Sequence, residues 1–161
     1  MRIALLALHF AEYASRLAIA LSAHHEVLLL LRGTNAENEL TDDLRALLEK
    51  SVEVHYLKVP RRRDPRVLGT SLSINRMLRR FSPDVLHVQE LDPVVGGWTI
   101  LSTRKSVPVV VTVHDPISHS GDGVGKDTLQ WKIIMWFRRR ASRLIVHGPR
   151  MRAELGVLDP H

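Results

Sequence analysis

The sequence predicts an α/β protein with an open, mostly parallel, twisted sheet and helices on both faces. Short apolar runs alternate along the chain with segments in which apolar residues recur every three or four positions, and these are the patterns of strands and helices respectively. The run over 108–113 contains five consecutive β-branched residues, as expected of a strand that is buried on both faces. Such alternation is typical of βαβ units joined by right-handed crossovers.

The first half of the chain predicts three strands. A continuous apolar run forms the strand over 1–8, and the next helix has its apolar face at Ala14, Leu17, Ala18 and Leu21. The second strand is expected over 26–31, and Thr41 is expected to cap a helix with Leu44, Leu47 and Leu48 on one face. Alternation over 51–59 predicts a third strand nearer an edge. A basic loop, 60–65, precedes a helix over 72–81.

The second half predicts three more strands and three more helices. The strands are expected over 85–89, 108–113 and 142–146. The helices are expected over 93–103, despite two glycines, over 126–140 and over 149–155, where Pro149 suits a first helical turn. The chain contains no internal repeat and no low-complexity segment.

Length, composition and charge limit the class of protein. A chain of 161 residues is expected to form one domain, 1–161, with a sizeable core. Cysteine is absent, which excludes disulfides and thiolate zinc sites and fits a cytoplasmic protein. No apolar run reaches the roughly 20 residues that span a bilayer, and charged residues follow the apolar start too soon for a secretory signal. The net charge of +6 predicts affinity for anions.

Ionisable side chains follow the predicted strands at their carboxyl ends, the edge at which open α/β sheets bind ligands. These residues are His9 with Phe10, Arg32, Glu90, His114 with Asp115, and His147. The loop after the fifth strand adds His119, Ser120 and Gly121. We therefore expect these side chains to converge on one rim and to form the floor of an active-site cleft.

The sequence lacks the motifs of several common site chemistries. A zinc site built from His114 with His119, or from His9 with His147, is disfavoured because the chain has no HExxH spacing. The chain also lacks a GxSxG elbow, a P-loop and a GxGxxG turn, and its first βα turn contains no glycine. No metal and no cofactor are therefore expected.

The basic residues raise the question of a polyanionic partner. Nucleic acid is not expected, because aromatic residues are only 5% of the chain and no zinc-finger, RRM or KH pattern is present. In the helix over 126–140, Leu129, Ile133, Trp136 and Phe137 are expected to face the core. Trp131 and Met135 are expected on another face, where burial against the core or a partner is favoured over exposure. If they are exposed, an aromatic and basic helix would suit an anionic membrane at its inner surface.

Four stretches in this order resemble a known family. They are MRIALLAL, FSPDVLHVQE, PVVVTVHDP followed by SHSGD, and RRRASRLIVHG. The chain is similar to the N-terminal, Rossmann-like domain of a GT-B fold glycosyltransferase of the large retaining family called glycosyltransferase group 1. The resemblance implies metal-independent transfer of a hexosyl group from a nucleotide sugar to a glycan or lipid-linked acceptor, with no cofactor beyond the donor.

The resemblance also implies roles and partners. The N-terminal domain holds the acceptor, and a C-terminal donor-binding domain or subunit, absent from this chain, completes the site, so the chain alone is expected to be inactive. His114 matches the family histidine that contacts the donor sugar, and Asp115 orients the loop or the acceptor. The residues expected to bind substrate by their position are His9, Phe10, Glu90, His119, Ser120, Gly121 and His147.

Two other interpretations remain open. The first is a non-catalytic Rossmann-like module that docks on a partner protein or on an anionic membrane surface. The second is a complete small enzyme that uses His114, His119 and Asp115 on a phosphorylated substrate.

Overall fold

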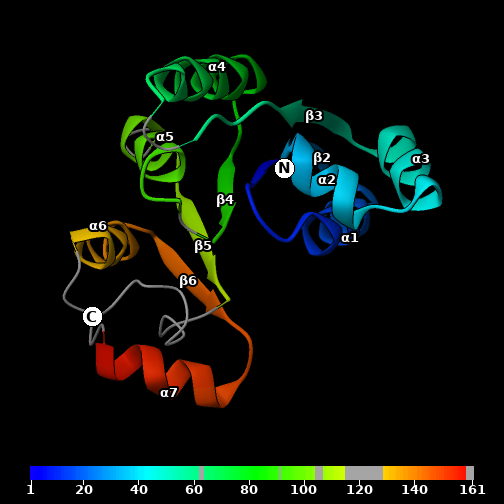
Figure 1. Ribbon diagram of the computed structural model, residues 1–161. Coiled ribbons are helices and arrows are strands. Elements are labelled where there is room, and N and C mark those ends of the chain that lie inside the picture. The colour runs from blue at the N-terminus through cyan, green and yellow to red at the C-terminus, as the bar shows by residue number, and fades with distance from the viewer. Residues whose placement is uncertain (62–63, 91, 104–106, 115–128, 159–161) are drawn as a thin grey trace.

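The structure, a computed structural model, describes residues 1–61, 64–90, 92–103, 107–114 and 129–158. Within these residues, six strands form one sheet in the order β3-β2-β1-β4-β5-β6, and all neighbouring strands are parallel (Figure 1). The strands are β1 (Arg2–Ala7), β2 (Glu26–Arg32), β3 (Glu53–Leu57), β4 (Val85–Gln89), β5 (Val109–Val113) and β6 (Arg143–Val146). The predicted fold class is confirmed. No helix of the described residues is long and apolar enough to cross a membrane.

Helices cover both faces of the sheet, as Figure 1 shows. They are α1 (Ala11–Ser22), α2 (Gly33–Glu39), α3 (Asp42–Ser51), α4 (Arg66–Phe81), α5 (Val95–Thr103), α6 (Leu129–Arg138) and α7 (Pro149–Leu158). Because successive side chains of a strand point to opposite faces, β1 sends Leu6 into the core beneath α4, α5 and α6, and Leu5 into the core beneath α1 and α3. This two-sided burial explains the continuous apolar runs.

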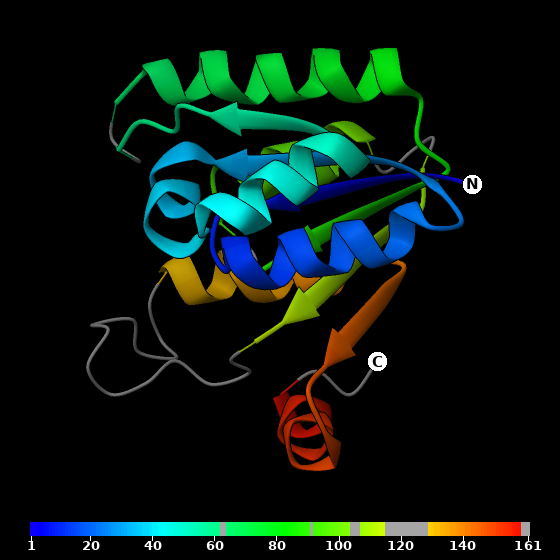
Figure 2. The ribbon, with the colours of Figure 1, turned by 90° about the vertical axis from the view of Figure 1, so that its right-hand side faces the viewer.

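The strand order creates a topological switch point between β1 and β4. The chain moves from β1 outward to β2 and β3, and then returns to β4 on the other side of β1. Figure 2 shows the strand arrowheads pointing to the same side of the molecule. In such sheets the crevice for ligands lies at the carboxyl ends of the two strands at the switch point. The loops after β1 and β4 are therefore the places to look for a site.

Helix α2 was not predicted from the sequence. Its residues, GTNAENE, contain no repeating apolar pattern, and Ala36 is the residue that the helix buries. Helix α4 was predicted to begin at residue 72, but it begins at Arg66. The first turns of α4 bury Val67 and Ser71, so a polar residue interrupts the apolar face there, which is why periodicity missed them.

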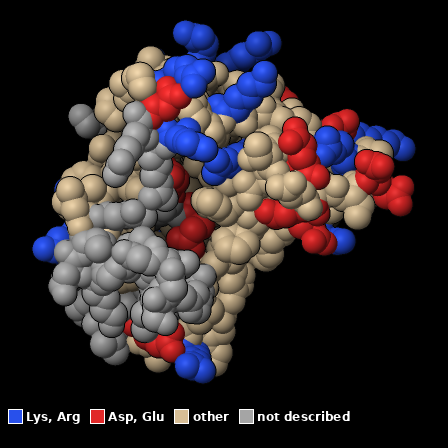
Figure 3. Space-filling view, in the orientation of Figure 1, with Lys and Arg blue, Asp and Glu red and all other residues tan. Residues whose placement is uncertain are grey.

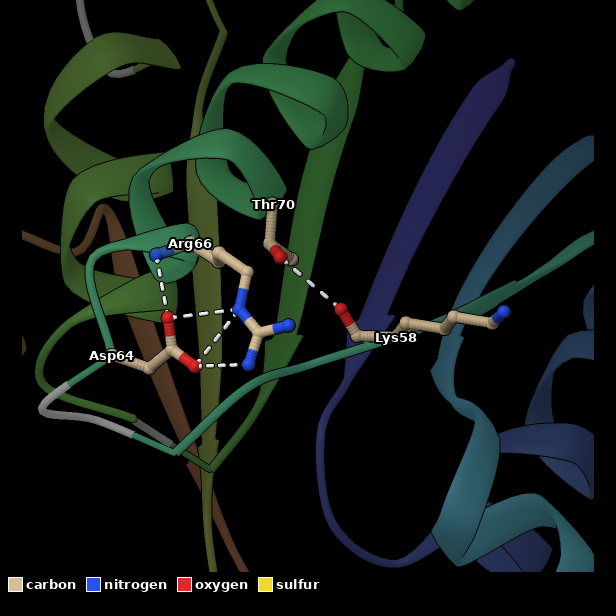
Figure 4. Close-up of polar contacts among 4 residues, drawn as sticks. All are labelled: Lys58, Asp64, Arg66 and Thr70. Carbon is tan, nitrogen blue, oxygen red and sulfur yellow. Dashed lines mark hydrogen bonds and ion pairs between the residues drawn. The ribbon is translucent and has the colours of Figure 1, made fainter.

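Figure 4 shows the contacts that begin α4. The carboxylate of Asp64 accepts a hydrogen bond from the backbone N–H of Arg66 at 2.9 Å and pairs with the guanidinium of the same residue at 2.6 Å. These hydrogen bonds lower the pKa of Asp64. One turn later, the hydroxyl of Thr70 donates to the carbonyl oxygen of Lys58 at 3.1 Å. The positive charge of Arg66 is thus partly neutralised.

Helix α6 corrects one expectation. Leu129 and Trp136, expected in the core, are exposed, whereas Trp131 and Met135, for which burial was favoured, are buried. The physical reason is the charge at Arg138, whose side chain is only 2% exposed. Its guanidinium lies over the Trp131 ring at 5.6 Å and contacts the Met135 sulfur at 3.8 Å, so these two side chains shield a buried cation.

Gly97 permits the close approach of α5 to α6. A Cβ atom at this position would lie 2.2 Å from Cε2 of Phe137, which is itself buried. We expect Gly97→Ala to destabilise the fold by about 1–3 kcal/mol through overpacking, despite the better helix propensity of alanine. Urea unfolding measures this change, and a smaller side chain in Gly97→Ala/Phe137→Leu should recover part of the loss.

The matched control is Gly69→Ala in α4, where nothing lies within 4 Å of the added Cβ. This substitution should leave stability unchanged or raise it by up to about 1 kcal/mol. Equal destabilisation at both positions would contradict the packing assigned to Gly97.

Candidate functional site

Two residues at the switch point have an unusual backbone conformation. Phe10 follows β1 with φ of 59°, and Glu90 follows β4 with φ of 54°, so both are left-handed. Non-glycine residues rarely adopt this conformation, which costs on the order of 1–3 kcal/mol and clusters at functional sites. In this structure it turns both side chains toward the end of β5.

A cluster of rings surrounds His114 at the carboxyl end of β5. The Phe10 ring stacks on the imidazole with a centroid distance of 4.0 Å and an interplanar angle of 26°, and the His147 ring lies 4.9 Å from it. The Tyr13 ring is roughly perpendicular to both imidazoles, with centroid distances of 5.4 Å and 5.5 Å. The structure therefore brings Phe10, His114 and His147 together.

Tyr13 was missed from the sequence, where it was an unassigned position in the first helix. Tyr13 lies in the first turn of α1, directly after the loop that carries Phe10. Its closeness to Phe10 in the sequence was the one feature that could have pointed to it. Together the rings offer flat faces and imidazole nitrogens at a rim, a combination suited to a polar ring such as a sugar.

Glu90 ties the ends of three elements together. Its carboxylate accepts a hydrogen bond from the backbone N–H of His114 at 3.1 Å, and its other oxygen pairs with the guanidinium of Arg138 at 3.5 Å. The backbone N–H of Glu90 donates to the carbonyl oxygen of Thr112 at 3.0 Å. Glu90, expected from its position to bind substrate, thus also fixes β4, β5 and α6 relative to one another.

A row of buried polar side chains leads from His114 into the sheet. Nε2 of His114 lies 3.2 Å from Oε1 of Gln89, and Nε2 of Gln89 lies 3.2 Å from Nε2 of His87. The same nitrogen of His87 lies 2.7 Å from the hydroxyl oxygen of Thr112. Burial, with a smaller contribution from the nearby His114, lowers the pKa of His87 to about 4.

The start of α1 has a carboxylate partner. The backbone N–H of Glu12 donates to the carboxylate of Glu39 at 3.3 Å, and the amide of Asn35 donates to the other oxygen of that carboxylate at 3.0 Å. Both partners come from α2, which the sequence did not predict. The carboxylate of Glu39 thus lies near the N-terminus of α1, the helix end at which related α/β sheets bind phosphate.

The structure gives less information about the remaining predicted site residues. His9 is half-buried at the end of β1. Asp115, His119, Ser120 and Gly121 lie outside the described residues.

The sequence of this chain matches a known family of domains. The family model of the glycosyl transferase 4-like domain matches residues 10–160. A search of curated proteins found no match.

Solved structures share the fold at low sequence identity. A UDP-N-acetylglucosamine 2-epimerase has a TM-score of 0.65 at 7% identity, covering 99% of this chain and 45% of its own. The UDP-GlcNAc 2-epimerase of Neisseria meningitidis, bound to UDP-GlcNAc, has a TM-score of 0.63 at 12% identity, covering 98% and 43%. The enzyme of Methanocaldococcus jannaschii has a TM-score of 0.61 at 12% identity, covering 100% and 43%. This chain therefore spans less than half the length of these structures.

Proposed function

Because the chain belongs to the glycosyl transferase 4-like domain family, we propose that it is the acceptor-side half of a retaining, metal-independent glycosyltransferase. The donor is a nucleotide sugar, and the acceptor is a hydroxyl group of a glycan or of a lipid-linked sugar. In the reaction, the bond from the anomeric carbon to the leaving phosphate oxygen breaks, a bond to the acceptor oxygen forms, and the hydroxyl proton leaves with the nucleotide or to solvent.

The ring cluster at the switch point is the observation that supports this proposal most directly. Phe10, Tyr13, His114 and His147 converge at the edge where α/β sheets bind ligands, and they come from the ends of β1, β5 and β6 and from α1. His114 is assigned to the donor sugar, with Asp115 beside it orienting the loop or the acceptor. His9 and Glu90 are assigned to substrate binding, and so, from the sequence alone, are His119, Ser120 and Gly121.

A second, donor-binding domain or subunit supplies the groups that stabilise the leaving phosphate. Transition-state stabilisation requires charges and hydrogen-bond donors held at fixed positions on both sides of the breaking bond. The described rim supplies one side, and the structures with the same fold are more than twice as long as this chain.

The reaction class is tested on the complete enzyme with a panel of nucleotide sugars and glycan acceptors. We expect release of the nucleoside diphosphate together with a glycoside, no loss of rate with a chelator, and a product with the anomeric configuration of the donor, read by NMR. Inversion would contradict the retaining assignment, and a rate abolished by chelation and restored by a divalent cation would contradict metal independence.

Docking on an anionic membrane is a second function, favoured by the surface of α4 and α5. Helix α4 contains four arginines and no acidic residue, and α5 contains no charged residue. Large apolar side chains are exposed on both helices: Leu68, Leu72, Trp98 and Leu101. Figure 3 shows basic side chains gathered over α4, whereas acidic side chains gather on the side of α2 and α3. Such a surface would bring a lipid-linked acceptor to the rim.

Vesicle sedimentation tests this docking. We expect the chain to bind vesicles that contain an anionic phospholipid and not neutral ones, and binding should weaken as salt rises because charge attraction is screened. Arg76→Ser/Arg80→Ser should reduce binding at least several-fold. Arg16→Ser/Lys50→Ser, which removes the same charge from the opposite helix layer, should not. Equal losses in both variants would leave only a net-charge effect and would contradict a docking face.

A further inference from the structure

The row that ends at His114 is held inside the sheet. Gln89 and Thr112 are completely buried, and His87 is 8% exposed. Gln89 and Thr112 are register partners on the neighbouring strands β4 and β5. Since alternate residues share a face, His87 and Gln89 on β4 and Thr112 on β5 lie on the same face of the sheet, and His114 directly follows β5. The amide of Gln89 thus lies between two imidazoles, one buried and one at the rim.

The chemistry of the amide fixes the direction of each hydrogen bond. The amide nitrogen of Gln89 can only donate, so Nε2 of His87, 3.2 Å away, must offer its lone pair. The hydroxyl oxygen of Thr112 lies 2.7 Å from the same nitrogen. The amide oxygen of Gln89 can only accept, so Nε2 of His114, at 3.2 Å, must carry a hydrogen.

We propose that Gln89 is a positioning residue that holds the neutral His114 ring in its Nε2-protonated tautomer and leaves Nδ1 as the acceptor nitrogen of that ring. Phe10 stacks on one side of the imidazole and His147 lies tilted near it, which limits rotation of the ring. In the proposed glycosyltransferase, on which this consequence rests, the tautomer determines which nitrogen of His114 can accept a hydrogen bond and which can donate one.

Nitrogen-15 NMR of the chain with labelled histidine tests the assignment without any substrate. At pH 8 the Nδ1 and Nε2 resonances of a neutral imidazole show which nitrogen carries the hydrogen, and His114→Asn identifies the signals. We expect His114 to populate the Nε2-protonated form almost exclusively. A predominant Nδ1-protonated form, or a mixture of both, in the wild-type chain would overturn the proposal.

Two variants separate positioning from general support of the fold. In Gln89→Leu, His114 should relax to a mixture of tautomers, while the exposed His24 and the half-exposed His55 keep their wild-type resonances. In Gln89→Glu, the carboxylate still accepts from His114, so its tautomer should persist, and the pKa of His87 should rise by roughly 1–3 units beside the new charge. A His114 tautomer unchanged in Gln89→Leu would also overturn the proposal.

The wild-type spectrum decides the matter even where a variant does not fold. Failure of this test and failure of the proposed function are distinguishable, because the tautomer is measured on the chain alone and glycosyl transfer on the complete enzyme.

Discussion

Replacing His114 by alanine in the complete enzyme should lower turnover at least several tens-fold, a loss of roughly 2 kcal/mol or more of transition-state stabilisation. The imidazole is held by Gln89, by Glu90 through the backbone, and by the Phe10 ring, so its position relative to the substrate is fixed before binding. The variant removes a hydrogen-bonding group at the rim and leaves the strand that carries it.

The rate constant kcat with saturating donor and acceptor measures this effect. The control is His55→Ala on the edge strand β3, whose imidazole contacts Glu53 away from the rim. An unchanged kcat in His114→Ala, with the fold confirmed by circular dichroism, would remove His114 from the active site.

Acidification should destabilise the protein through His87. The imidazole has a pKa of about 4 in the folded chain and 6.5 as its ordinary value. Between these pH values the unfolded chain binds a proton that the folded chain does not. The free energy of unfolding should therefore fall by roughly 3 kcal/mol at most as the pH drops from about 6.5 to about 4. Above pH 6.5 His87 should cause no such destabilisation, because its imidazole is then neutral in both the folded and the unfolded chain.

Urea unfolding between pH 7.5 and pH 4.5 tests this dependence in the wild type and in His87→Gln. Carboxylates titrate in both proteins, so the informative quantity is the difference between the two curves. We expect the wild type to lose more stability over this range than the variant. Parallel curves would show that His87 is not buried as a neutral imidazole. His55→Gln serves as the control for loss of a more exposed histidine.

Much of the fold was predictable because buried parallel strands have a recognisable sequence pattern, a short continuous apolar run. The runs in β1, β2 and β5 are apolar on both faces, and their order with the intervening helices defines the architecture. Helix α2 was not predictable from periodicity, because one buried alanine is too weak a pattern. Its existence matters for the site, since Glu39 lies beside the start of α1.

The site was predictable in its location but not in its internal contacts. Strand ends gave His114 and His147, because every parallel strand delivers its last residues to one edge. Gln89 could not be singled out, because its role depends on the register of β4 against β5. In the sequence Arg138 is one of three consecutive arginines, 138–140, and only the packing of α6 shows that it is the buried partner of Glu90.

The central proposal is that this chain carries one side of a divided glycosyltransferase site, and the most direct test compares the chain with the complete enzyme. Glycoside formation from nucleotide sugars should be undetectable with the chain alone and should appear when the donor-binding half is added. Turnover by the chain alone at the rate of the complete enzyme would contradict the division.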